Sequence, residues 1–250
     1  MKEGYEMVQN IYDNQAFFDG YKKIRDNIDS ANNIEERPAI LSLLPDLRGK
    51  RVLDLGCGYG ENCRLFSESG AEAVVGIDIS DKMLSVAKSE NAFGNISYIK
   101  MPMENIDELS GRFDVVVSSL AIHYVGLYDV LAQDVFSLLN NGGVFVFSQE
   151  HPLVTAPKTG VKWEYTADGQ VDYYCLSNYT ISGQRTIFWI VDGVVKYHRT
   201  FSDIINPLLS AGFAIKTILE PIISEDIVKR IPSYEKNKHV PNYLLISAQK

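Results

Sequence analysis

Residues 52–60 read VLDLGCGYG, an apolar run that ends in three glycines at alternate positions. Glycine adopts positive φ without steric cost, and it lets a ligand approach the backbone closely. A helix-length segment then begins near Glu61. A strand, a glycine turn and a helix in this order place a binding surface at the carboxyl end of a strand, where ligands bind in open α/β sheets.

The residues around this turn indicate what it binds. A dinucleotide fingerprint, G-x-G-x-x-G, would place its third glycine where Glu61 stands. Asp54 lies beside the turn, and its carboxylate repels a pyrophosphate but suits a cationic ammonium or sulfonium group. Asp78 closes the next apolar run, 22 positions beyond Gly56, and can accept hydrogen bonds from both ribose hydroxyls, while Ile79 can pack on a purine. The pattern predicts a nucleoside with a cationic, phosphate-free tail.

Outward from this turn, short β-branched runs alternate with helix-length segments, which is typical of repeated βαβ units and a mostly parallel sheet. The predicted strands lie at 52–55, 73–77, 96–99, 115–117 and 144–147. The predicted helices lie near 12–30, 34–47, 61–69, 81–89, 104–109, 129–139 and 201–210. Extended segments at 213–219 and 242–248 complete the expected sheet.

The alternation breaks after residue 150. Four strand-like pieces follow at 161–165, 171–175, 185–191 and 194–199. Turn signals at Asp168-Gly169 and Asp192-Gly193 predict antiparallel pairing. We expect a Rossmann-like α/β fold, a three-layer sandwich with a seven-stranded, mostly parallel sheet and an antiparallel insertion after the fifth strand that forms a lid.

We expect one domain over residues 1–250. Its predicted parts are an N-terminal helical cap, a cofactor-binding core, the lid insertion, and the last helix and strands of the core, at 1–47, 48–150, 151–200 and 201–250.

Several stretches carry a family resemblance. The strings LDLGCGYG and GIDIS, with FDVVVSSLAIHYV and LLNNGGVFVFS, resemble the class I S-adenosylmethionine-dependent methyltransferases over residues 48–150. They are most similar to the small-molecule branch that includes quinone-biosynthesis enzymes. The resemblance implies S-adenosylmethionine as cofactor and methyl transfer to an N, O, S or C nucleophile of a small-molecule acceptor.

The resemblance also implies cofactor-binding residues. Those expected near the methionine part are Asp54, Gly56, Cys57, Gly58 and Ser119, and those near the ribose and adenine are Asp78 and Ile79. Pro102 stands where many members carry an acid that contacts the adenine amino group, so Met103 or Glu104 takes that role in our expectation. Tyr21, in the aromatic N-terminal stretch, is a further candidate contact.

Methyl transfer requires an aligned acceptor, exclusion of water and, for a protonated acceptor, a base. His123 and His151 follow the fourth and fifth predicted strands, and His198 leaves the insertion. These three are our candidate catalytic residues, and a hydrogen-bonded structural role is the alternative for each. The sequence shows no spacing typical of a metal site, so no metal is expected.

Aromatic residues concentrate in the two segments expected to cover the site. Residues 161–200 hold both tryptophans, and the N-terminal cluster comprises Tyr12, Phe17, Phe18 and Tyr21. Such rings can wall a dry acceptor pocket, whereas core packing or a homodimer interface is the alternative.

Composition restricts the partners. The chain has 24 Lys and Arg against 32 Asp and Glu, a net charge of −8, without a basic block longer than a pair. A nucleic-acid partner or an anionic membrane is therefore disfavoured. An odd count of three cysteines and the lack of a long apolar run favour a cytoplasmic protein.

Two other functions remain open. The first is a catalytically silent S-adenosylmethionine-binding protein with a regulatory or interaction role. The second is an NAD-dependent oxidoreductase, which the glycine spacing opposes.

Overall fold

The computed structural model describes residues 8–160 and 162–250. Residues 1–7 of the expected cap and Val161 of the expected insertion lie outside this part. Residues 8–14 are called the N-terminal segment below. None of the described helices has the length and apolar character needed to cross a membrane.

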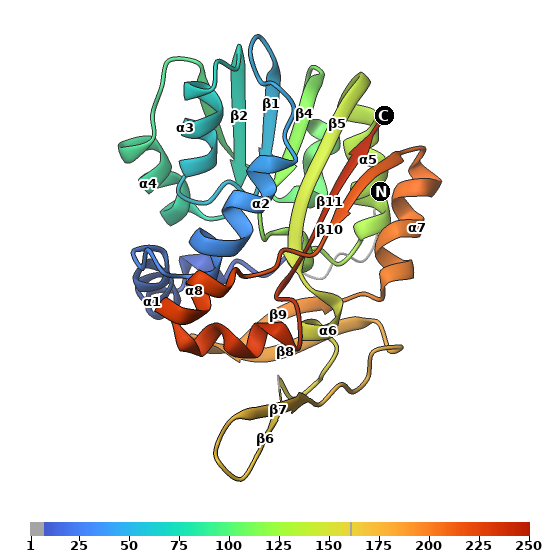
Figure 1. The fold of residues 1–250 in the computed structure, drawn as a ribbon. Coiled ribbons are helices and arrows are strands. Elements are labelled where there is room, and N and C mark those ends of the chain that lie inside the picture. The colour runs from blue at the N-terminus through green and yellow to red at the C-terminus, as the bar shows by residue number, and fades with distance from the viewer. Residues whose placement is uncertain (1–7, 161) are drawn as a thin grey trace.

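A seven-stranded sheet with the order β10-β11-β5-β4-β1-β2-β3 forms the centre of the molecule (Figure 1). The neighbouring pairs among β3, β2, β1, β4 and β5 are all parallel. Strand β11 runs antiparallel to both β5 and β10. The strands are β1 (Arg51–Leu55), β2 (Ala73–Asp78), β3 (Ile96–Lys100), β4 (Phe113–Ser118), β5 (Leu139–Glu150), β10 (Ala214–Leu219) and β11 (Tyr243–Gln249). The predicted sheet is confirmed.

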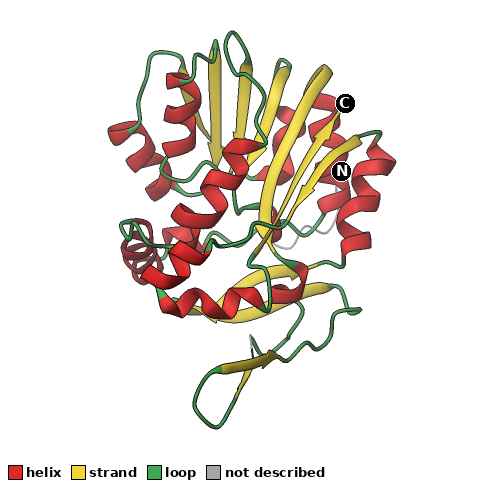
Figure 2. Ribbon diagram, viewed as in Figure 1, coloured by secondary structure: helices red, strands yellow, loops and turns green. Residues whose placement is uncertain are grey.

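Helices cover both faces of this sheet (Figure 2). They are α1 (Gln15–Arg25), α2 (Arg37–Ser42), α3 (Glu61–Glu68), α4 (Asp81–Glu90), α5 (Tyr128–Leu138), α6 (Pro152–Thr155), α7 (Phe201–Ala211) and α8 (Glu225–Arg230). Alternate residues of β1 explain the layering, because Val52 packs in the cluster that holds Phe66 of α3, whereas Leu53 packs in the cluster that holds Leu131 of α5. The sheet is thus buried on both faces, as parallel sheets are.

The helices predicted at 61–69, 81–89, 129–139 and 201–210 agree with α3, α4, α5 and α7 to within one residue at each end. The Ser80 hydroxyl accepts from the Met83 N–H at 3.1 Å and begins α4 as expected. The predicted helix over 34–47 is instead a π-helical turn, Asn32–Glu36, followed by the short α2. Helix α8 was not predicted.

The insertion after β5 forms two antiparallel hairpins, β6 (Trp163–Tyr165) with β7 (Val171–Tyr174), and β8 (Gly183–Trp189) with β9 (Val191–His198). They lie beyond the carboxyl ends of the parallel strands (Figure 1). The antiparallel insertion is therefore confirmed.

The position of the second turn was predicted wrongly. Trp189 pairs with Val191, so the chain reverses at Ile190, which has φ +64°, and Asp192-Gly193 lies inside β9. The side chain of Ile190 fills the space that Gly20 of α1 leaves open. This tertiary contact outweighs the local turn preference of Asp-Gly.

Candidate active site

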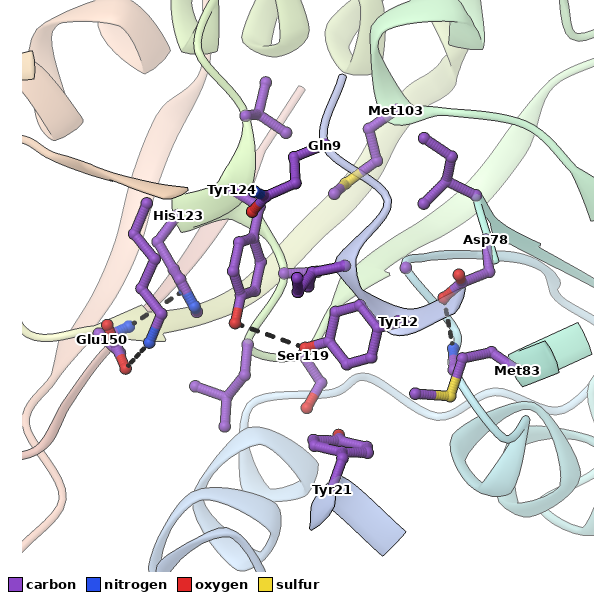
Figure 3. Close-up of a pocket in the computed structure, with 18 of the residues that line it drawn as sticks. Gln9, Tyr12, Tyr21, Asp78, Met83, Met103, Ser119, His123, Tyr124 and Glu150 are labelled. Atoms are coloured by element: carbon purple, nitrogen blue, oxygen red, sulfur yellow. Dashed lines mark hydrogen bonds and ion pairs between the residues drawn. The ribbon is translucent and has the colours of Figure 1, made fainter. Parts of the chain in front are cut away.

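A cavity of about 330 Å³ opens at the carboxyl ends of β1 to β5, under the N-terminal segment. Ligand pockets span roughly 300–1,000 Å³, so the cavity is of ligand size. The predicted site residues that line it are Tyr21, Gly56, Gly58, Asp78, Ile79, Met103, Glu104, Ser119 and His123. In Figure 3, Asp78 and Met103 lie on one side of Tyr12, and His123 and Glu150 lie on the other. The cavity thus has two chemically different ends.

The glycine turn supplies backbone to the first end. Gly56 has φ +71°, and a Cβ on it would lie 2.6 Å from the Cβ of Ala121 in the loop after β4. The Cys57 N–H donates to the Ile77 carbonyl at 2.9 Å and fixes the turn against β2. The two loops therefore meet only because Gly56 has no side chain.

Asp78 lies at the end of β2 and faces this turn. Its Oδ2 accepts from the Gly58 N–H at 2.9 Å, and its Oδ1 accepts from the Ser80 N–H at 2.8 Å. Burial raises the pKa of Asp78, against the lowering effect of these two bonds. Each carboxylate oxygen has a second lone pair, so Asp78 can also accept from two ligand hydroxyls. The geometry suits a ribose.

Asp54 and Cys57 were expected at the cofactor, but the structure does not place their side chains at the cavity. Asp54 is 1% exposed beneath the turn, where its Oδ2 accepts from the Cys63 thiol at 3.3 Å. Burial raises the pKa of Asp54 to about 7. The side chain of Cys57 is buried toward Gly76 of β2. Strand alternation explains the position of Asp54, because it turns this side chain of β1 into the core toward α3, whereas Cys57 follows β1 in the turn.

The loop after β3 forms another wall. Pro102, Met103 and Glu104 all line the cavity, and burial raises the pKa of Glu104. Met103 and Glu104 are therefore placed where an adenine contact was expected. That role stays a prediction.

The loop after β4 is held by a buried carboxylate that the sequence did not reveal. Glu36, from the π-helical turn, is 1% exposed and accepts from the hydroxyls of Ser119 at 2.8 Å and Ser148 at 2.5 Å. Burial raises the pKa of Glu36, although these hydrogen bonds work in the opposite direction.

The N-terminal segment is bound to the core at both ends of the cavity. The Gln9 side chain donates to the Gly193 carbonyl at 2.8 Å and accepts from the Val195 N–H at 2.9 Å. The Asn10 amide donates to the Ile79 carbonyl at 3.3 Å. The segment therefore connects hairpin β8–β9 to the end of β2.

Aromatic rings line the middle of the cavity. Tyr12 packs edge-on against Tyr21 and Phe17, with ring centroids 5.2 and 4.9 Å apart, and Phe17 packs edge-on against Trp189 at 5.2 Å. The Tyr12 hydroxyl donates to that of Tyr124 at 3.4 Å. Rings from the N-terminus and from the insertion thus meet at the site.

Most aromatic residues of the insertion do not take part in this wall. Of those at 162–200, only Trp189 lines the cavity, whereas Tyr165, Tyr173 and Phe188 are exposed. Of the two alternatives for this cluster, the pocket wall therefore applies to Trp189, whereas other rings face solvent because alternate residues of a two-stranded ribbon do so.

The second end of the cavity is polar and deeply buried. Lys196 of β9 donates to Oε1 of Glu150 at 2.6 Å, and its ammonium lies 4.5 Å from the ring centre of Trp189. Burial works to raise the pKa of Glu150, but the adjacent ammonium outweighs it, so the pKa is lowered and the carboxylate is charged. Burial lowers the pKa of His123 to about 3, and its Nδ1 accepts from the Glu150 N–H at 3.5 Å. This end therefore combines a neutral imidazole with an ion pair.

The other two candidate histidines do not reach the cavity. His151 is 1% exposed and bonds Glu220 through Nε2 at 2.8 Å, while its Nδ1 caps α6. His198 is fully buried between the Thr155 hydroxyl at 2.9 Å and the Tyr179 carbonyl at 2.8 Å. Both histidines therefore have the hydrogen-bonded structural role that was the alternative to catalysis, because both ring nitrogens of each are bonded to other protein groups.

Three residues of the site were missed in the sequence. Glu150 ends the fifth strand at the same sheet edge as His123, and that position was a usable signal. Lys196 lies in the alternating buried positions of β9, which is unusual for lysine. Glu36 carries no local signal. Among the described residues, no three His, Cys, Asp or Glu side chains are arranged to hold a metal ion.

We expect Glu35→Gln to stabilise the protein at alkaline pH. Glu35 is 5% exposed, its Oε1 has no hydrogen-bond partner, and burial raises its pKa from 4.5 to about 7. A raised pKa adds stability at low pH that is lost as pH rises through 7. The unfolding free energy of the variant minus that of the wild type is measured by urea denaturation at pH 5 and at pH 8. We expect this difference to be about 1–3 kcal/mol larger at pH 8. Asp226→Asn, whose side chain is 93% exposed, is the control, and a pH-independent difference for Glu35→Gln would contradict this account.

Comparisons with known proteins agree with the cavity's cofactor end. A family model described as a methyltransferase domain matches residues 52–143. The crystal structure of an S-adenosylmethionine dependent methyltransferase from Mesorhizobium loti is similar, with 35% identity, a TM-score of 0.79, and coverage of 91% of this chain and all of that one.

Two curated relatives extend this comparison. An uncharacterized protein of Haemophilus influenzae is 38% identical over 96% of this chain and 97% of its own length. A malonyl-[acyl-carrier protein] O-methyltransferase of Enterobacter lignolyticus is 31% identical over 54% of each chain. With a backbone cradle at Gly56 and a carboxylate at Asp78, the cavity fits S-adenosylmethionine. The chain belongs to the class I S-adenosylmethionine-dependent methyltransferases.

Proposed function

We propose that this enzyme methylates a small-molecule acceptor that binds at the Glu150–Lys196 end of the cavity. The observation that carries the proposal is one cavity in which the glycine turn and Asp78 line one end, Glu150 and Lys196 line the other, and aromatic rings lie between them. S-adenosylmethionine supplies an electrophilic methyl group when bound. The protein's own residues then have to orient the acceptor and exclude water.

The enclosure supports a small acceptor. The N-terminal segment and hairpin β8–β9 both cover the cavity and are hydrogen-bonded to one another through Gln9. A net charge of −8 gives no attraction for a nucleic-acid backbone. A homodimer stays a prediction.

The polar end also suggests how a proton is handled. His123 is a weak base because its pKa is about 3, and we assign it a hydrogen-bonding role rather than the general-base role. Glu150 is charged and lines the cavity, so it would orient the acceptor by accepting a hydrogen bond from it, while its lowered pKa makes it a weak base as well. Lys196 would stabilise negative charge that develops on the acceptor.

A label-transfer screen tests the proposal. The enzyme is incubated with methyl-labelled S-adenosylmethionine and a library of small metabolites. We expect label in at least one product, and about tenfold slower transfer to that acceptor by Lys196→Met, because a buried charged hydrogen bond contributes about 1.5–3 kcal/mol. Lys100→Met, which breaks an exposed ion pair with Asp81, is the matched control.

Two results would contradict the proposal. Cofactor binding without transfer to any metabolite would favour the catalytically silent alternative. Equal rates for Lys196→Met and Lys100→Met would move the acceptor away from the Glu150–Lys196 end.

A further inference from the structure

Glu36 forms a hydrogen-bond centre behind the wall of the cavity. Its Oε1 accepts from the hydroxyls of both Ser119 and Ser148, and its Oε2 accepts from the Asn32 amide at 2.9 Å. Asn32 in turn bonds Arg25, which pairs with Glu61 at the start of α3. A buried carboxylate with three donors is well satisfied, so its position is firmly determined.

The bond to Ser119 fixes what that serine offers to a ligand. A serine hydroxyl has one hydrogen and two lone pairs. Ser119 donates its hydrogen to Glu36, away from the cavity that it lines, so its oxygen is left as an acceptor. The lone pairs of this oxygen can accept a hydrogen bond from an ammonium N–H that enters the cavity.

The bond to Ser148 fixes the neighbouring backbone. Ser148 donates to Glu36 and accepts from the Leu120 N–H at 2.9 Å. Leu120 has φ +51°, a conformation that costs a non-glycine residue of order 1 kcal/mol and needs support from its surroundings. Glu36 therefore holds both the hydroxyl of Ser119 and the strained backbone beside it.

We propose that Glu36 is a positioning residue that makes the loop after β4 specific for the ammonium group of the cofactor's amino-acid tail. It does not line the cavity and acts through Ser119 and Leu120. The inference rests on the cofactor that the family uses, and it is independent of the acceptor proposed above.

Two ligands that differ in that tail provide the test. S-adenosylhomocysteine carries the amino-acid tail, and 5′-methylthioadenosine lacks it. For Glu36→Ala we expect the Kd of S-adenosylhomocysteine to rise about tenfold or more, and that of 5′-methylthioadenosine to change less than about threefold, by isothermal titration calorimetry. Glu36→Gln keeps an oxygen for the two serine hydroxyls and should retain most of the discrimination. Glu35→Ala, the neighbouring buried carboxylate, is the matched control.

The outcomes separate a positioning role from a merely structural one. Equal losses for the two ligands would indicate general damage to the fold and overturn the proposal, as would an unchanged Kd for S-adenosylhomocysteine. If Glu36→Ala does not fold, Ser119→Ala and Ser148→Ala replace it. We then expect the Kd of S-adenosylhomocysteine to rise more than that of 5′-methylthioadenosine. Absence of this difference in both variants overturns the proposal. Failure of the wild type to bind S-adenosylhomocysteine would instead contradict the cofactor assignment.

Discussion

Replacing Gly56 with alanine is expected to raise the Kd of S-adenosylmethionine at least about 100-fold, because the new methyl group pushes apart two loops that both line the cofactor end. Its Cβ would lie 2.6 Å from the Cβ of Ala121, and neither atom can rotate away. The residue also has φ +71°, which costs alanine of order 1–3 kcal/mol. Calorimetry measures the affinity, and urea denaturation should show a loss of about 1–3 kcal/mol in unfolding free energy.

Gly142→Ala is the control for backbone strain. Gly142 has φ +78°, similar to Gly56, but nothing lies within 4 Å of a Cβ there. We expect it to lose stability and keep cofactor affinity. If Gly56→Ala bound the cofactor as well as Gly142→Ala does, the contact between the two loops would not matter for binding.

Asp78→Ala is expected to produce a loss of affinity of similar size. A carboxylate that accepts from two ribose hydroxyls makes two charge-assisted bonds of roughly 1.5–3 kcal/mol each, so the Kd should rise about 100-fold or more. The variant also leaves the Gly58 and Ser80 N–H groups without their acceptor, which loosens the glycine turn. Asp78→Asn keeps an acceptor oxygen and should show a smaller loss.

Asp81→Asn provides the comparison for Asp78. Asp81 is three positions away, its side chain is 68% exposed, and it pairs with Lys100 outside the cavity. The Asp81→Asn variant should bind S-adenosylmethionine with the affinity of the wild type. An Asp78→Ala variant that also binds with wild-type affinity would place the ribose elsewhere.

The cofactor end could be predicted because its signals are local. Gly56, Gly58 and Asp78 belong to two strand ends, and the parallel sheet brings such ends to one edge whatever the rest of the chain does. Asp54 is only four residues from Gly58 but does not reach the cavity at this edge, because it lies within the buried strand. Its side chain belongs to a strand that is covered on both faces.

The polar end and the support behind Ser119 could not be predicted in the same way. Glu36 bonds residues that are 83 and 112 positions away, and Lys196 bonds Glu150 across 46 positions. No alternation or cap marks such pairs. The histidines are misleading because a ring at a strand end can also be used inside the fold, as His151 shows by capping α6.

The way in which the N-terminal segment closes over the cavity has an evolutionary consequence. Gln9 bonds the Gly193 carbonyl and the Val195 N–H, and Asn10 bonds the Ile79 carbonyl, so the core partners of these two side chains are backbone atoms. Backbone atoms persist when side chains are substituted. The residues of hairpin β8–β9 can therefore diverge toward a different acceptor in a descendant of this enzyme without losing the closure that shields the reaction from water.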